Sequence, residues 1–181
     1  TEPEREAEVI DRLRSLAAEA HARLLAFGNL VGGAAATTIT MLIVHWPRVF
    51  IVHAGDSRCY RLRDGIFEQL TTDQTMAQAM VDAGAMSRQV AEASNLKNIL
   101  ISAVGGSQLD IQVIATEIRR SDRYLLCTDG LTRYVSDEEI HEQVGSQRPS
   151  EDVCTTLRDM ALERGGADNV TIICGGPKYG R

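Results

Sequence analysis

The chain has 181 residues, 44% hydrophobic and 24% charged, with a formal net charge of -6 at pH 7. This length and composition predict one globular domain, or most of one, with a hydrophobic core of its own. The acidic balance argues against nucleic acid as a partner, because nucleic-acid binders gather Lys and Arg on one face. The longest apolar stretch, residues 39–46, is far shorter than the roughly 20 residues of a membrane-spanning helix, so no membrane partner is expected.

The four cysteines show no Cys-x-x-Cys spacing, and three of them lie in apolar, strand-like runs. They are Cys59, Cys127, Cys154 and Cys174. Such cysteines are typical of reduced, buried thiols, which favours a cytoplasmic protein. The amino terminus is charged and begins with Thr1 instead of methionine, so we expect no secretory signal and a chain cut from a longer one.

The apolar residues of the first segment recur at three- and four-residue steps, which predicts one amphipathic helix over residues 2–27. They are Val9, Leu13, Leu16, Ala20, Leu24 and Phe27. His21 lies on this helix and is expected at its surface. A Gly/Ala-rich loop is expected over residues 28–36.

Four strands are predicted next, in two pairs. They cover residues 37–46, 48–54, 59–63 and 66–70. Asp64-Gly65 joins the second pair and is a strong signal for a two-residue β-hairpin turn. His45 and His53 alternate with apolar neighbours in the first pair, and we expect half-exposed strand residues there instead of metal ligands.

The rest of the chain is predicted to contain helices and strands that come mostly in pairs. Helices are predicted over residues 72–83 and 87–93, strands over 111–118 and 123–127, a helix opening with a capping box at Ser136, a helix over 150–164 and a strand over 170–174. Consecutive hairpins with helices before and after them favour the α+β class, with helices packed outside antiparallel sheets.

Two acidic dipeptides stand at strand ends. Asp129-Gly130 follows the strand at 123–127, and Asp168-Asn169 precedes the strand at 170–174. If these strands pair antiparallel, both carboxylates lie at the same edge of one sheet. Carboxylate and water oxygens suit Mg²⁺ or Mn²⁺, so a site for a hard cation is predicted. The alternative, that each dipeptide is only a turn, stays open on these residues alone.

Five short motifs in order carry a family resemblance. They are Ala36-Thr37-Thr38, Gly55-Asp56-Ser57-Arg58, the run from Leu125 to Leu131, the run from Val135 to Ile140, and the run from Gly166 to Thr171. Together they resemble the bacterial metal-dependent protein phosphatases of the PPM family. The resemblance implies an α+β, four-layer α/β/β/α sandwich of two antiparallel sheets with helices outside. It also implies that residues 1–181 are the carboxy-terminal two-thirds of that domain, truncated at the amino terminus.

The resemblance also implies roles for single residues. Asp129 and Asp168 match ligands of one of two catalytic Mn²⁺ or Mg²⁺ ions. Asp56 matches an aspartate that holds a third, more weakly bound ion together with the aspartate matching Asp129. Supporting residues around these ligands are Gly130, Asn169, Thr37, Thr38 and Ser57. No protein nucleophile is expected, since neither a Cys-x5-Arg loop nor a Gly-x-Ser-x-Gly elbow is present.

The implied activity is hydrolysis of phosphoserine and phosphothreonine in proteins that a serine/threonine kinase has modified. The Asp-Gly-x-Gly-Gly motif, whose aspartate bridges both metals in the family, has no counterpart in residues 1–181. We therefore expect weak or no activity from this chain alone. The alternative is a pseudophosphatase, a regulatory module that binds phosphoproteins without turnover. Exposed sheet edges are expected to be covered by a second copy of the chain.

Overall fold

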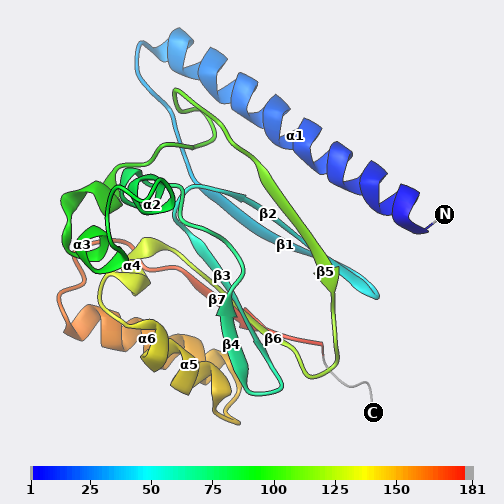
Figure 1. Ribbon diagram of the computed structural model, residues 1–181, viewed down its shortest axis with the longest axis vertical. Helices are drawn as coiled ribbons and strands as arrows, with labels where there is room; N and C mark the ends of the chain where they lie inside the picture. The colour runs from blue at the N-terminus through cyan, green and yellow to red at the C-terminus, as the bar shows by residue number, and fades with distance from the viewer. Residues whose placement is uncertain (1, 178–181) are drawn as a thin grey trace. The chain divides into compact units, whose positions relative to one another are not determined.

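A computed structural model describes residues 2–177, which form two compact units built from interleaved segments (Figure 1). Residues 2–56 and 73–116 form the first unit, and residues 57–72 and 117–177 form the second. Each unit contains one β-sheet together with helices, which confirms the predicted α+β class. No helix within residues 2–177 has the length and apolar character needed to cross a membrane.

The first unit combines a three-stranded sheet with one long helix and shorter helical segments. Its elements are α1 (Glu2–Val31), β1 (Ile39–His45), β2 (Arg48–Ala54), α2 (Met76–Asp82), α3 (Arg88–Ala93), the 3-10 helix η1 (Asn95–Asn98) and β5 (Gln112–Glu117). The strand order is β1-β2-β5, and β1 pairs antiparallel with β2 around the turn that contains Pro47. The two strands predicted over 37–54 are therefore confirmed.

Helix α1 differs from its prediction in length and in the side that it buries. It continues four residues past Phe27, into the segment expected to be a loop. Ala17 and Gly28 are buried, whereas Leu16 and Phe27, two of the apolar residues whose spacing predicted the amphipathic helix, are 43% and 54% exposed. Small residues on the packed side let other backbone approach the helix closely, and apolar periodicity alone does not reveal such a face.

Polar residues of α1 also lie on its packed side. The Arg48 guanidinium donates to the Glu6 carboxylate at 2.7 Å. The Gly105 backbone N–H donates to Nδ1 of His21 at 2.9 Å. His21, which was expected at the helix surface, is half-buried, and its ring nitrogen anchors a loop of the same unit.

Strand β2 is buried along almost its whole length, and this includes a histidine. His53 is 0% exposed, and its Nδ1 lies 2.9 Å from Oγ1 of Thr40 on β1. The expectation of a half-exposed residue is wrong for His53, because a strand covered on both faces does not alternate between core and solvent. His45, at the end of β1, is exposed.

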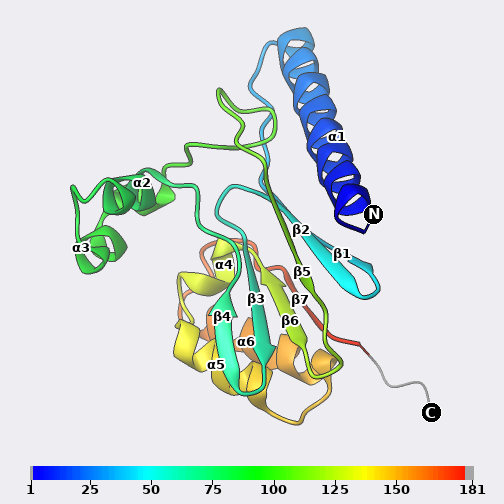
Figure 2. The same ribbon diagram turned by 45° about the vertical axis from the view of Figure 1, so that its right-hand side comes forward.

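The second unit is a four-stranded antiparallel sheet with two longer helices on one face (Figure 2). Its elements are β3 (Arg58–Arg63), β4 (Ile66–Gln69), β6 (Arg123–Cys127), α4 (Asp129–Thr132), α5 (Asp137–Gly145), α6 (Ser150–Glu163) and β7 (Ile172–Gly175). The strand order is β4-β3-β6-β7, and every neighbouring pair is antiparallel.

The core of the second unit lies between the sheet and helices α5 and α6. Its fully buried members are Leu125, Leu131, Ile140, Val153, Leu157 and Ala161. Each large aliphatic side chain buried there contributes about 1.5–3 kcal/mol relative to exposure. This core therefore holds β6 and β7 in place from one side of the sheet.

Two local predictions are confirmed in the second unit. Asp64 and Gly65 have φ values of 50° and 83°, the left-handed pair that a tight turn between β3 and β4 requires. Ser136 and Glu139 form the predicted capping box at the start of α5, with reciprocal bonds of 3.3 Å and 3.0 Å between side chain and backbone.

The four cysteines are free thiols, as expected. The expected burial is confirmed for Cys59 and Cys127, whereas Cys154 and Cys174 are half-buried. Burial raises the pKa of the Cys59 thiol on β3 to about 12. That thiol is therefore protonated at neutral pH and serves as a small core residue.

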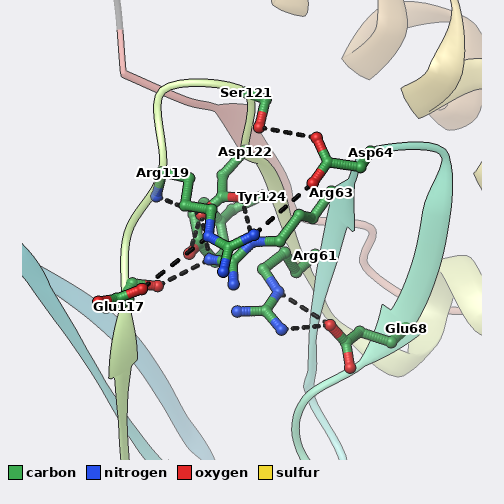
Figure 3. Close-up of polar contacts among 9 residues, drawn as sticks. All are labelled: Arg61, Arg63, Asp64, Glu68, Glu117, Arg119, Ser121, Asp122 and Tyr124. Carbon is green, nitrogen blue, oxygen red and sulfur yellow. Dashed lines mark hydrogen bonds and ion pairs between the residues drawn. The ribbon is translucent and has the colours of Figure 1, made fainter.

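A buried carboxylate stands just before β6 (Figure 3). The Asp122 side chain is 0% exposed. Its carboxylate accepts hydrogen bonds from Nε and Nη2 of Arg63 at 2.6 and 2.7 Å. It also accepts the Arg119 backbone N–H at 2.8 Å and the Tyr124 hydroxyl at 3.0 Å. The loop before β6 is thereby attached to β3, which supplies Arg63.

The substitution Asp122→Asn is expected to destabilise the protein by about 2–4 kcal/mol, because it leaves the Arg63 charge without its buried partner. Burial raises the pKa of Asp122, but hydrogen bonds from Arg63, Arg119 and Tyr124 outweigh burial and hold it below its usual range. The stabilisation is thus complete above the unfolded pKa of about 4 and is lost as pH falls through the lower folded pKa.

Urea unfolding of the wild type and of Asp122→Asn at pH 7 and near pH 3 measures both effects. The difference between the two proteins should shrink at the lower pH. Asp159→Asn is the control, because Asp159 is exposed and pairs only with its exposed neighbour Arg158 among the contacts described. Equal stability of the wild type and Asp122→Asn at pH 7 would contradict a stabilising role of the Asp122 cluster.

Candidate metal centre

The sheet of the second unit brings two acidic segments to one edge. Strands β6 and β7 are direct antiparallel neighbours, with Cys127 opposite Ile172 at the end of the paired region. The chain leaves β6 toward Asp129 at the same edge from which it enters β7 after Asp168. The antiparallel pairing on which the predicted site depended is therefore confirmed.

Hydrogen bonds continue across this edge beyond the two strands. The Thr128 N–H donates to the Thr171 carbonyl at 3.1 Å, and the Thr171 N–H donates to Oγ1 of Thr128 at 3.0 Å. The same hydroxyl donates to the Asn169 carbonyl at 3.2 Å. Thr128, which sequence reasoning passed over, thus ties the two acidic segments together.

The two carboxylates converge on one guanidinium group. Oδ2 of Asp129 accepts a hydrogen bond from Nη2 of Arg133, and Oδ2 of Asp168 lies 3.1 Å from Nη1 of the same side chain. Sequence reasoning missed Arg133. The signal was available, because a residue four positions after an aspartate at a helix start lies beside it on the helix surface.

Gly130 allows the Asn169 segment to approach. A Cβ atom on Gly130 would lie 2.3 Å from the Asn169 carbonyl oxygen, closer than any real contact. Gly130 lies within the helical turn α4 and is not among the described glycines with positive φ. Asp129-Gly130 therefore opens a helical turn, and the glycine provides space for a neighbouring backbone.

Asn169 supports the site through its backbone. Its N–H donates to Oδ1 of Asp168 at 2.8 Å, which orients that carboxylate. Its carbonyl accepts from Thr128, as described above. Asn169 thus contacts Asp168 through its main chain.

Thr37 and Thr38 belong to the first unit. Thr37 exchanges two backbone hydrogen bonds of 2.9 Å with Val104. The Thr38 side chain packs against Gly55, where an added Cβ would lie 2.4 Å from its Cγ2. Thr38 therefore shapes the backbone immediately before Asp56, whereas Thr37 pairs with the segment around Val104.

Asp56 and Ser57 stand where the chain passes from the first unit to the second. Asp56 is half-buried, and Ser57 is buried. The neighbouring Gly55 N–H donates to Oε1 of Gln74 at 2.9 Å, within the first unit. A third metal held by Asp56 and Asp129 stays a prediction, since these residues belong to different units.

The donor chemistry of the second unit fits one hard divalent cation. Asp129 and Asp168 have side chains that are 27% and 42% exposed, so water can reach both carboxylates. Arg133 neutralises one of their two negative charges. Mg²⁺ commonly binds through one or two carboxylates and keeps several waters. Within residues 2–177, no group of three or more His, Cys, Asp or Glu side chains is arranged to hold a metal.

The chain is similar to the serine/threonine protein phosphatase PstP of Mycobacterium tuberculosis. The two sequences are 39% identical over 137 residues, which are 76% of this chain and 26% of PstP. The crystal structure of the M. tuberculosis serine/threonine phosphatase PstP/Ppp matches with a TM-score of 0.81 at 34% identity, over 88% of this chain and 68% of that chain. A crystal structure of the PstP catalytic domain in complex with two manganese ions matches with a TM-score of 0.74 at 35% identity, over 85% and 65% of the two chains.

A third similar structure is that of the PPM Ser-Thr phosphatase MsPP from Mycobacterium smegmatis, in complex with cacodylate. It matches with a TM-score of 0.68 at 31% identity, over 77% of this chain and 61% of that chain. No protein-family model matches the chain. The chain spans about a quarter of the length of PstP and about half the length of the phosphatase stp of Listeria innocua.

The substitution Gly130→Ala is expected to lower the free energy of unfolding by about 1–3 kcal/mol, because the new methyl group collides with the Asn169 carbonyl. Gly145→Ala, at the end of α5, is the matched control. Its Cβ would meet only ordinary van der Waals contacts of 3.9 Å, and alanine favours the helical conformation. Chemical denaturation of both variants measures the difference. A Gly130→Ala protein as stable as the control would contradict the close approach.

Proposed function

The chain belongs to the PPM family of bacterial serine/threonine protein phosphatases, and on that basis we propose that it takes part in hydrolysing phosphoserine and phosphothreonine in proteins. Asp129 and Asp168 would hold one Mn²⁺ or Mg²⁺ ion. The observation that carries this proposal is the convergence of both carboxylates on a single cationic group, the guanidinium of Arg133.

The residues of the second unit supply position and charge. The Asn169 N–H holds one oxygen of Asp168, and Thr128 holds the two acidic segments at a fixed separation. Gly130 lets the Asn169 backbone lie close to α4. When bound, the metal would lower the pKa of its water to about 7 and would offset charge on the phosphate oxygens.

Two metal ions, with a third near Asp56, complete the proposed centre of the whole domain. The PstP catalytic domain carries two manganese ions in its crystal structure. The donors identified in the second unit of this chain are oxygen atoms, which suit Mn²⁺ and Mg²⁺ better than zinc. The proposed substrates are phosphoproteins made by a serine/threonine kinase, and the proposed compartment is the cytoplasm.

The alternative function is a phosphoprotein-binding module without turnover. One observation favours it: the described residues contain no group of three or more potential ligand side chains at one point. Two carboxylates alone give a metal few protein ligands. The chain by itself would then bind metal and phosphopeptide weakly and release no phosphate.

We also propose that a second copy of the chain covers the edges of the four-stranded sheet. The four-stranded sheet of the second unit ends at β4 and β7, whose outer backbone groups offer pairing positions to another strand. A second copy of the chain is the proposed occupant. Sedimentation at micromolar concentration should therefore give a mass above the 19.8 kDa of one chain, and a monomer would contradict this.

The metal site is tested first by binding. Asp129→Asn and Asp168→Asn are each expected to weaken Mn²⁺ binding at least about tenfold, since each removes one of two anionic ligands. Isothermal titration calorimetry measures this change. Asp159→Asn removes the same charge from an exposed position on α6 and should leave the affinity unchanged. Equal affinity of all four proteins would refute the ligand assignment.

Turnover separates the two functions. Phosphate release from a phosphothreonine peptide is measured with Mn²⁺ and with a chelator present. The phosphatase proposal expects slow, Mn²⁺-dependent release that Asp129→Asn abolishes. The alternative expects saturable peptide binding and the same background release in both proteins.

A further inference from the structure

We propose that Arg133 is an internal counter-ion that competes with the metal for Asp129 and Asp168, so that metal binding requires its guanidinium to leave both carboxylates. This inference rests on the proposed function, because it takes these aspartates to be metal ligands. It adds a residue that controls how readily the site accepts its ion.

The contacts place the guanidinium between the two carboxylates that are the proposed metal ligands. Its two terminal nitrogens each contact a different aspartate, Nη2 the Oδ2 atom of Asp129 and Nη1 the Oδ2 atom of Asp168. A metal bound by the same two oxygens would meet a like charge within a few ångströms. Such charges repel strongly near a protein surface, so the two occupants exclude each other.

The backbone holds Arg133 at this position, and its side chain remains able to leave. Its N–H donates to the Asp129 carbonyl at 3.0 Å, which completes the turn of α4. The side chain is 36% exposed, so the guanidinium can move into water without opening the core. Departure of the guanidinium therefore requires a change in side-chain rotamer only.

The Asp168 carboxylate remains oriented when the guanidinium leaves. Oδ1 of Asp168 keeps its bond from the Asn169 N–H at 2.8 Å, and only Oδ2 is released. The threonine bonds across the sheet edge do not involve Arg133. Arg133 thus keeps the metal-free site assembled by cancelling repulsion between the carboxylates, and it also raises the metal concentration needed to fill the site.

The size of the reduction in metal affinity follows from the solvent exposure of the Arg133 ion pairs. Ion pairs open to water are individually weak, so two of them should reduce metal affinity by about threefold to tenfold. A neutral residue of similar length should remove that competition. Arg133→Gln is therefore expected to bind Mn²⁺ about threefold to tenfold more tightly than the wild type.

The experiment compares wild type, Arg133→Gln and Arg158→Gln by calorimetric titration with Mn²⁺, and by thermal melting with a chelator and with Mn²⁺. Arg158 pairs with the exposed Asp159 on α6, so its removal changes net charge equally without touching the site. Arg133→Gln is expected to melt lower with chelator, to bind Mn²⁺ more tightly and to gain more stability from it. Arg158→Gln should bind Mn²⁺ like the wild type.

The outcomes distinguish the proposed metal site from the counter-ion role of Arg133. If the wild type binds Mn²⁺ and Arg133→Gln binds it equally or more weakly, the counter-ion role is overturned and the proposed metal site stands. If neither protein binds Mn²⁺ at millimolar concentration, the metal site and the inference are overturned together.

If Arg133→Gln does not fold, Arg133→Lys tests the counter-ion role of Arg133 instead. A lysine ammonium is a point charge that cannot fork between two carboxylates as a guanidinium does. Arg133→Lys is therefore expected to bind Mn²⁺ more tightly than the wild type, though less tightly than a neutral variant would. Affinity equal to or below the wild type would overturn the inference.

Discussion

The antiparallel pairing of β6 with β7 determines where both aspartates of the proposed metal centre lie. Leu125 is fully buried and stands opposite Cys174, so the register is set by the same core that stabilises the unit. A slip of one residue would turn Leu125 out of the core, because side chains alternate between the two faces of a strand. The positions of Asp129 and Asp168 are therefore a consequence of hydrophobic packing several residues away.

Strand β6 has a carboxylate site near each end, and burial gives the two sites different properties. Asp122, before the strand, is fully buried and accepts four hydrogen bonds, so its partner Arg63 is a permanent part of the fold. Asp129, after the strand, is partly exposed and shares one guanidinium with Asp168. A buried charge without its partner costs several kcal/mol, roughly 3–5, whereas an exposed pair contributes about 1 kcal/mol or less. Only the exposed site can exchange its cation.

Sequence reasoning succeeded where a short signal determines a short structure. The Asp64-Gly65 hairpin and the Ser136 capping box depend on neighbouring residues alone, and both are present. It failed where tertiary contacts choose between faces: α1 packs through Ala17 and Gly28, and buried His53 meets Thr40 on the adjacent strand. The edge shared by the two aspartates was predictable, because one assumption about strand direction fixed it. Their shared partner Arg133 was missed because a charge on a one-turn helix has many possible partners.

The two Asp-Gly dipeptides of the second unit show why a motif needs a physical reason. In Asp64-Gly65 both residues adopt positive φ, so the glycine is there for its conformational freedom. In Asp129-Gly130 the glycine is helical, and the space of its missing side chain is taken by the Asn169 carbonyl. The same dipeptide therefore forms a turn at Asp64-Gly65 and allows a close approach of two segments at Asp129-Gly130. Only the second arrangement brings a distant acid, Asp168, to the side of the first, and that convergence is what a metal or a guanidinium can bind.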